Sequence, residues 1–175
     1  IVDKQFFDHF RKRLFSLYYH IPLEEDEIEI STMFQVTNQM DPNPLSPKNK
    51  GWVHKDGTHV LAGVIYLTPE AKYDTGTSFY KMSTHMDTDK QYADVMKQYY
   101  SSGENSEGFD KAIEGMNSHF TENLRIYNIY NRMIAFDGQE FHAATSYVCD
   151  TPRLTQVFFV SYIGTRALPP LKRYH

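Results

Sequence analysis

The residues with the clearest chemical potential are His54 and Asp56, which form a His-x-Asp motif in the stretch WVHKDG at 52–57. In an extended strand, residues i and i+2 project from the same face, so an imidazole nitrogen and a carboxylate oxygen can reach one point. A second His would complete a face of two imidazoles and one carboxylate, which suits a first-row metal with open positions. The motif alone is a weak signal, so its meaning depends on the rest of the chain.

Two later features of the chain make a metal site at the His-x-Asp motif a stronger prediction. His142 follows a tight-turn signal at 137–138 and has small neighbours, which leave room beside an imidazole. Arg153 and Thr155 follow a second turn at 150–152 and, two positions apart, face the same way. An inward-facing guanidinium needs an anion, and its parallel donors match a carboxylate. The residues therefore predict a three-ligand metal face beside a carboxylate-binding group.

Short stretches of alternating or continuous apolar residues predict the β-strands that must position these side chains. Besides the His-x-Asp stretch, they span 28–37, 60–68, 76–80, 123–130, 132–136, 141–148 and 153–162.

Helical periodicity occurs at 3–20, where Asp3 can serve as N-cap, and at 89–100 and 106–120. The last two helices would lie in an insertion at 84–121 between strands. About eight short strands with such an insertion predict a mainly β, α+β fold. Its core would be a double-stranded β-helix of the jelly-roll or cupin type, with an N-terminal helix outside it.

Composition narrows the class of protein. The length of 175 residues favours one domain over 1–175, with its core at about 28–162, and 41% hydrophobic residues suffice for that core. A net charge of −4 offers no basic face for nucleic acid, and no apolar run is long enough for a bilayer. The single Cys149 excludes an internal disulfide and favours a reducing compartment, so we expect a cytoplasmic protein.

The full constellation resembles the signature of the Fe(II)- and 2-oxoglutarate-dependent oxygenases. It comprises His54-x-Asp56, then His142 after a long gap, then Arg153-x-Thr155 eleven positions later. The stretches VIYL at 64–67 and GT at 76–77 are similar to the prolyl-hydroxylase-like branch of that superfamily. The resemblance covers about residues 28–162, and no single piece of it is specific.

This resemblance implies a role for each matching residue. Iron(II) would be held by His54, Asp56 and His142. Arg153 would pair with the distal carboxylate of 2-oxoglutarate, with hydrogen bonds from Thr155 and Tyr66. The implied activity consumes O2, converts 2-oxoglutarate to succinate by oxidative decarboxylation and hydroxylates an unidentified small-molecule or peptide substrate.

Two other interpretations remain open from the residues alone. The same triad could hold Zn2+ and activate a water for hydrolysis, with Arg153 binding an acidic substrate. Alternatively, the protein is a non-catalytic jelly-roll binding module in which His and Asp only hydrogen-bond to each other. The loop at 38–51 and the insertion at 84–121 are the expected substrate walls. The oligomeric state cannot be predicted from these patterns.

Overall fold

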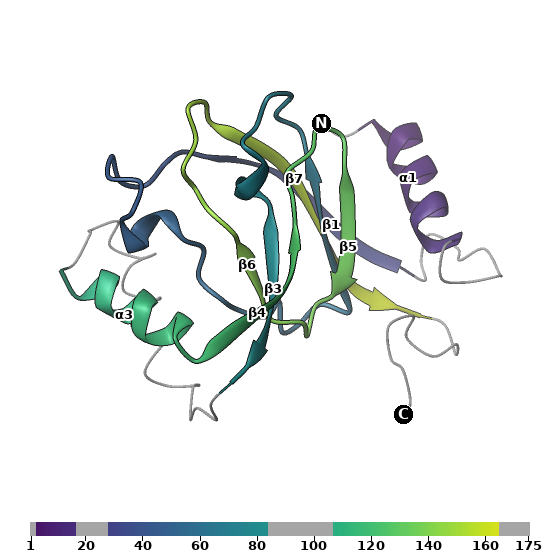
Figure 1. Cartoon of the computed structure of the whole chain (residues 1–175). Helices are drawn as coiled ribbons and strands as arrows, with labels where there is room; N and C mark the ends of the chain where they lie inside the picture. The colour runs from purple at the N-terminus through teal and green to yellow at the C-terminus, as the bar shows by residue number, and fades with distance from the viewer. Residues whose placement is uncertain (1–2, 17–27, 84–106, 165–175) are drawn as a thin grey trace.

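Two antiparallel β-sheets dominate the computed structural model, which describes residues 3–16, 28–83 and 107–164 (Figure 1). In spatial order, the larger sheet contains β1 (Ile28–Thr37), β7 (Arg153–Ile163), β2 (Leu61–Tyr66) and β5 (Met133–Asp137). The smaller sheet contains β4 (Phe120–Ile126), β3 (Thr77–Met82) and β6 (His142–Ala144). The other described elements are the helices α1 (Lys4–Ser16) and α3 (Glu107–Asn117) and the 3-10 turns η2 (Pro47–Asn49) and η3 (Tyr73–Thr75). The prediction of a β-rich α+β fold is confirmed.

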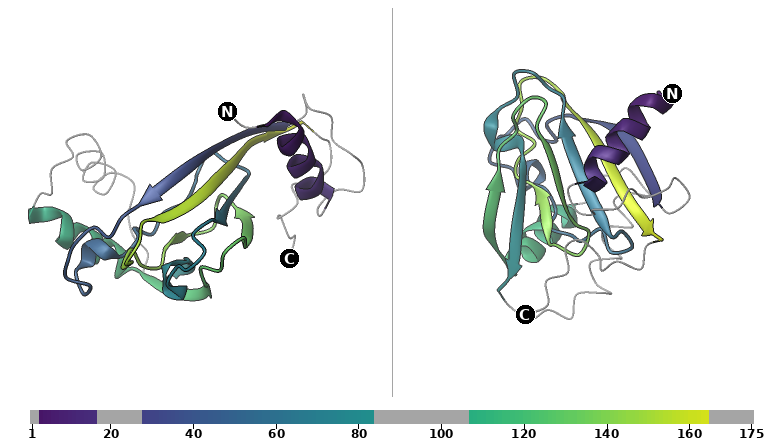
Figure 2. Two further views of the ribbon diagram at one scale, coloured as in Figure 1. Left: turned by 90° about the horizontal axis from the view of Figure 1, so that it is seen from above. Right: turned by 90° about the vertical axis from the view of Figure 1, so that its right-hand side faces the viewer.

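The chain alternates between the two sheets. After β1 in the larger sheet, His54 forms a single bridge to His142 and so joins the edge of the smaller sheet beside β6. The chain then returns to the larger sheet in β2, enters the smaller one in β3 and β4, and alternates again through β5, β6 and β7. Figure 2 shows the two sheets lying against each other.

Side chains from both sheets meet between them. The Tyr66 hydroxyl on β2 donates a hydrogen bond of 2.7 Å to the Thr77 hydroxyl oxygen on β3. The rings of Phe79 on β3 and Phe136 on β5 meet edge to face, with centroids 5.0 Å apart. Because these contacts join strands of different sheets, they hold the two layers together around the site.

Helix α1 covers the outer face of the larger sheet, as its sequence periodicity predicts. Leu14 and Phe15 are buried in one apolar cluster with Leu61 of β2 and Phe158 and Val160 of β7. The Asp3 carboxylate accepts a 2.8 Å hydrogen bond from the backbone N–H of Gln5, which satisfies a free donor at the helix start. The remainder of the predicted helix, 17–20, lies outside the described residues, as does the predicted helix at 89–100.

Some predicted strand boundaries were wrong, because the ends of these strands depend on pairing with distant parts of the chain. The stretch 52–57 is not a strand but makes only the His54–His142 bridge. Strand β6 ends at Ala144, opposite the first residue of β3, and after it Tyr147 N–H bonds to the Asn49 carbonyl at 2.7 Å instead of continuing the sheet. Strand β4 begins at Phe120, opposite Met82 of β3, so the insertion ends before residue 121.

The second predicted insertion helix is confirmed as α3. Across the described ranges, no helix combines the length and the apolar character that crossing a membrane requires.

Candidate metal centre

Three side chains converge at the edge of the smaller sheet. His54, Asp56 and His142 each offer one ligand atom, and these atoms all lie within 4.8 Å of one another. His54 Nε2 is 3.6 Å from Asp56 Oδ1, and His142 Nε2 is 3.3 Å from Asp56 Oδ2. Two imidazole nitrogens and a carboxylate thus face a common point, as the sequence spacing predicted.

Backbone pairing brings the three residues together. His54 and His142 exchange two backbone hydrogen bonds of 3.0 and 2.9 Å, which place their rings side by side with centroids 4.5 Å apart. The Asp56 N–H donates to the carbonyl of Gly138 at 2.8 Å, in the tight turn that precedes β6. A Cβ at position 138 would clash with the His59 carbonyl, so glycine permits this close approach. Asp56 therefore points at the His pair without belonging to a strand.

The other ring nitrogen of each His is held by a backbone carbonyl. His54 Nδ1 lies 2.8 Å from the Trp52 carbonyl oxygen, and His142 Nδ1 lies 2.9 Å from that of Glu140. Because a carbonyl only accepts, each Nδ1 carries a proton, and Nε2 of each ring faces Asp56. This is the arrangement found around metal-binding histidines, where an outer partner fixes tautomer and ring orientation.

Electrostatics favour deprotonated ligands. Burial, together with the neighbouring His142, lowers the pKa of the His54 imidazole below its usual value. Burial alone would raise the pKa of the Asp56 carboxyl, but the hydrogen bond and charge of His142 and the charges of His54 and His59 lower it. The lowered pKa values of the His54 imidazole and the Asp56 carboxyl make these two groups more readily available as ligands for a divalent cation.

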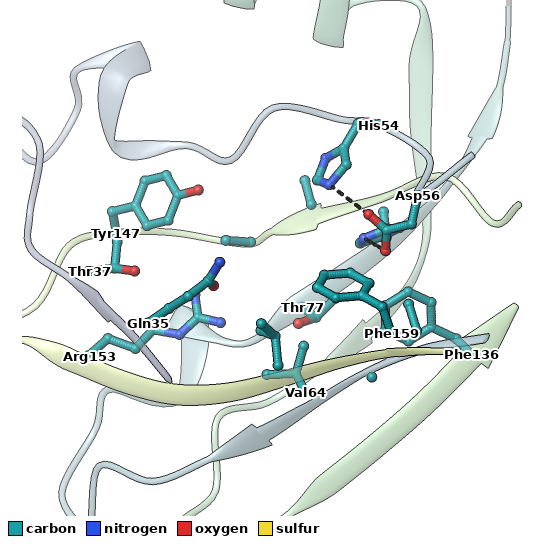
Figure 3. Close-up of a pocket in the computed structure, with 16 residues that line it drawn as sticks. Gln35, Thr37, His54, Asp56, Val64, Thr77, Phe136, Tyr147, Arg153 and Phe159 are labelled. Atoms are coloured by element: carbon teal, nitrogen blue, oxygen red, sulfur yellow. Dashed lines mark ion pairs between the residues drawn. The ribbon is translucent and has the colours of Figure 1, made fainter. Parts of the chain in front are cut away.

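A cavity of about 250 Å³ connects the triad with Arg153, between the two sheets. Figure 3 shows His54 and Asp56 at one end of this cavity and Arg153 at the other, beside Gln35, Thr37 and Tyr147. Apolar side chains line the wall between the two ends, among them Val64, Phe136, Val157 and Phe159. A ligand in the cavity can therefore contact both ends at once.

Arg153 is a buried cation without an acidic partner. Its residue is 8% exposed, its Nε has no hydrogen-bond partner, and no ion pair among the described residues includes it. Burial lowers the pKa of its guanidinium, against the influence of Tyr66, Tyr147 and Cys149. The Tyr66 ring centroid lies 5.7 Å from the guanidinium carbon. Because burial of an unpaired charge is costly, this end of the cavity is built for an anion.

Residues 4–153 match the family of unknown function DUF6445. The chain belongs to the DUF6445 family. The matched span begins with α1 and ends at Arg153, so it includes all three convergent ligands as well as the buried cation. Neither a curated protein nor a solved structure matches the chain. Because the DUF6445 description assigns no function, the chemistry has to be argued from the site.

The other two predicted site residues lie beneath the cavity wall. Tyr66 is fully buried, and its hydroxyl donates to Thr77, which itself lines the cavity. Burial raises the pKa of the Tyr66 phenol, so it stays protonated and able to donate. Thr155 is 2% exposed and lies two residues after Arg153 on β7, where it pairs with Tyr66 of β2. Both residues therefore support the Arg153 end.

Sequence reasoning missed Gln35, Thr37 and Tyr147, which line the Arg153 end. The sequence does indicate that Gln35 and Thr37 share one face, because strand β1 was predicted with its observed bounds and alternate residues of a strand lie on the same face. Only the pairing of Thr37 with Arg153 shows which face looks into the cavity. In the described structure, the loop at 38–51 contributes no lining residue and packs instead against α3.

Proposed function

We propose that this protein is an Fe(II)- and 2-oxoglutarate-dependent dioxygenase that hydroxylates a substrate still to be identified. The observation that carries this proposal is the combination of two ends in one cavity: a His-Asp-His triad and a buried, unpaired arginine. A dicarboxylate with a 2-oxo acid group at one end fits this combination. Its 2-oxo acid end would bind the metal held by the triad, while its distal carboxylate would pair with the guanidinium of Arg153.

The winding of the chain supports a double-stranded β-helix, the jelly-roll architecture that accompanies this chemistry. Counting the His54 bridge as a strand position, the strands give spatial orders of first-eighth-third-sixth in the larger sheet and fifth-fourth-seventh-second in the smaller. Successive positions thus alternate between sheets except from β3 to β4, which pair directly although the helical insertion separates them in the chain. This winding puts the second, seventh and eighth positions, which carry the triad and Arg153, around one cavity.

Each residue has a defined task in this proposal. His54, Asp56 and His142 would hold Fe(II), which with 2-oxoglutarate and O2 supplies the oxidising chemistry that yields succinate and CO2. Arg153 binds the distal carboxylate through parallel N–H donors, backed by the Tyr66 ring. Phe136, Phe159 and Val64 exclude water between the two ends. The two backbone carbonyls keep Nε2 of each His unprotonated and aimed at the metal position.

Exchange of the metal separates this proposal from hydrolysis on the same triad. Metal-free protein is loaded with Fe(II) or with Zn2+, supplied with 2-oxoglutarate, ascorbate and air, and assayed for succinate. We expect slow succinate formation with Fe(II) but not with Zn2+, because an oxygenase converts some 2-oxoglutarate even when the true substrate is absent. It should disappear in His142→Ala, which loses a ligand. Bound Fe(II) with no 2-oxoglutarate consumed would contradict the proposal.

A further inference from the structure

The segment that carries His54 lies at an open edge of the smaller sheet. On one side, Gly51 N–H donates to the Ala144 carbonyl at 3.0 Å, and His54 pairs with His142. A Cβ on Gly51 would clash with the Ala144 backbone, so the approach to β6 is close. On the other side, the described part of the chain places no strand. The backbone groups that point to that side therefore need partners of another kind.

Asn117, the last residue of α3, supplies those partners with its side chain. Its Nδ2 donates to the Gly51 carbonyl at 3.0 Å, and its Oδ1 accepts from the Val53 N–H at 3.1 Å. A side-chain amide has the same donor and acceptor as a peptide group. Because its amide bonds to both Gly51 and Val53, the Asn117 side chain pairs with backbone groups that a neighbouring strand would otherwise satisfy. We call these two hydrogen bonds the Asn117 clamp.

Trp52, between the two clamped residues, connects α3 directly to His54. Its indole Nε1 lies 2.9 Å from Met116 Sδ, and its ring packs against the buried cluster of Phe109, Ile113 and Met116. The same indole stacks on the His54 imidazole, with centroids 5.1 Å apart and planes at 29°. The Trp52 carbonyl accepts a hydrogen bond from His54 Nδ1–H. Fixing residues 51–53 thus fixes the group that sets the tautomer and direction of His54.

We propose that α3 positions His54 through the Asn117 clamp, so that the helical insertion is part of the metal centre's support. Asn117 is a positioning residue, because it touches the 51–53 backbone and not the ligands. Figure 1 shows α3 beside the η2 turn, at the end of the molecule from which the His54 segment emerges. The inference rests on the metal-binding part of the proposed function, but the clamp acts on His54 whether or not a metal is bound.

The test compares Asn117→Ala, which loses both clamp bonds, and Asn117→Asp, which keeps only the acceptor for Val53 N–H. The matched control is Ser118→Ala. Its hydroxyl bonds to the Gly115 carbonyl at 2.6 Å, at the same helix end but away from 51–53. NMR of the metal-free proteins follows hydrogen exchange of the Val53 amide and the His54 Nδ1 proton. Equilibrium titration then gives the Fe(II) dissociation constant without oxygen.

For Asn117→Ala we expect faster exchange at Val53, a broadened or lost Nδ1 signal, and Fe(II) affinity lower by about 10- to 100-fold, as for other outer-shell changes. Asn117→Asp should retain more Val53 protection and more affinity than Asn117→Ala. Ser118→Ala should match the parent in all three measurements.

Parent-like exchange and affinity in a folded Asn117→Ala protein would overturn the inference. Equal losses in Ser118→Ala would also overturn it, because they would show a general effect of helix stability. If the parent binds no Fe(II), the proposed function fails. The exchange and Nδ1 measurements then still decide whether Asn117 holds His54.

Discussion

At the scale of single residues, Arg153 distinguishes this site from a simple metal-binding cluster. Arg153 is 8% exposed and has no acidic neighbour among the described residues, so an anion that enters the cavity would stabilise its buried charge. The triad alone is compatible with several metals and reactions. The position of Arg153 at the far end of the same cavity is the reason for proposing a dicarboxylate that also reaches the metal.

Replacing Arg153 should therefore separate cosubstrate binding from metal binding. Arg153→Ala is expected to keep the Fe(II) affinity of the parent and to lose about 2–5 kcal/mol of 2-oxoglutarate binding, because one partner of a buried charge pair is removed. Calorimetric titration of the metal-free protein with Fe(II), and then of the metal-loaded protein with 2-oxoglutarate, measures the two affinities. Arg125→Ala is the control, since that guanidinium is exposed and pairs with Glu122 on the surface. Undiminished 2-oxoglutarate affinity in Arg153→Ala would show that Arg153 has another role.

The pH dependence of metal binding follows from the ligand pKa values. Protons compete with the metal for His54, and burial places the pKa of its imidazole below the ordinary value of 6.5. The contribution of His54 to the affinity should therefore be fully present above pH 6.5 and decline only as the pH falls through this lowered pKa. The Asp56 carboxyl stays ionised in this range, because its pKa also lies below the ordinary value. Fe(II) titrations from pH 8 to 5 test this, and a decline already between pH 8 and 7 would contradict it.

Residue spacing was sufficient to predict which side chains converge, but not how they are held. The order and separation of His54, Asp56 and His142 anticipated the cluster. The role of Asn117 was not predictable, because a polar residue at a helix end usually serves as a cap. Only its position beside residues 51–53, 64 to 66 positions away in sequence, reveals the clamp.

At the scale of elements, local patterns predicted the strands well where pairing is regular. β1 matches its predicted bounds, and β7 differs by one residue, because both have long regular patterns and pair with each other along their length. Prediction was poorer where ends depend on distant partners. The start of β4 is set by its register with β3 across the insertion, and this information is not local. The His54 segment is not a strand, because it makes only one bridge to β6, while the Asn117 side chain bonds to its other side.

Helix α1 should contribute to stability without affecting the chemistry, since it packs on the face of the larger sheet opposite the cavity. Leu14 is 1% exposed and packs in the cluster with Phe158 and Val160. Leu14→Ala should cost about 2–5 kcal/mol in the free energy of unfolding, from lost burial and the cavity left behind. Urea denaturation measures this cost, with Lys12→Ala on the exposed side of α1 as control. A loss of Fe(II) affinity in folded Leu14→Ala would contradict this division of roles.

At the scale of the whole molecule, the site belongs to neither sheet alone. His142 lies on β6 of the smaller sheet, and Arg153 begins β7 of the larger one. The contacts between the sheets, Tyr66 with Thr77 and Phe79 with Phe136, set the separation of the metal end from the anion end. If the proposed function holds, the distance between the two sheets sets the length of dicarboxylate that can contact both ends.

One anaerobic titration tests the central claim most directly, and it requires no knowledge of the substrate. Metal-free protein is titrated first with Fe(II) and then with 2-oxoglutarate, while the visible absorbance is recorded. We predict a weak charge-transfer band that appears only when both are present and that saturates with 2-oxoglutarate. Fe(II) demonstrably bound without such a band would contradict the dioxygenase proposal and favour hydrolysis on the same triad. Failure to bind any divalent metal would leave a binding module.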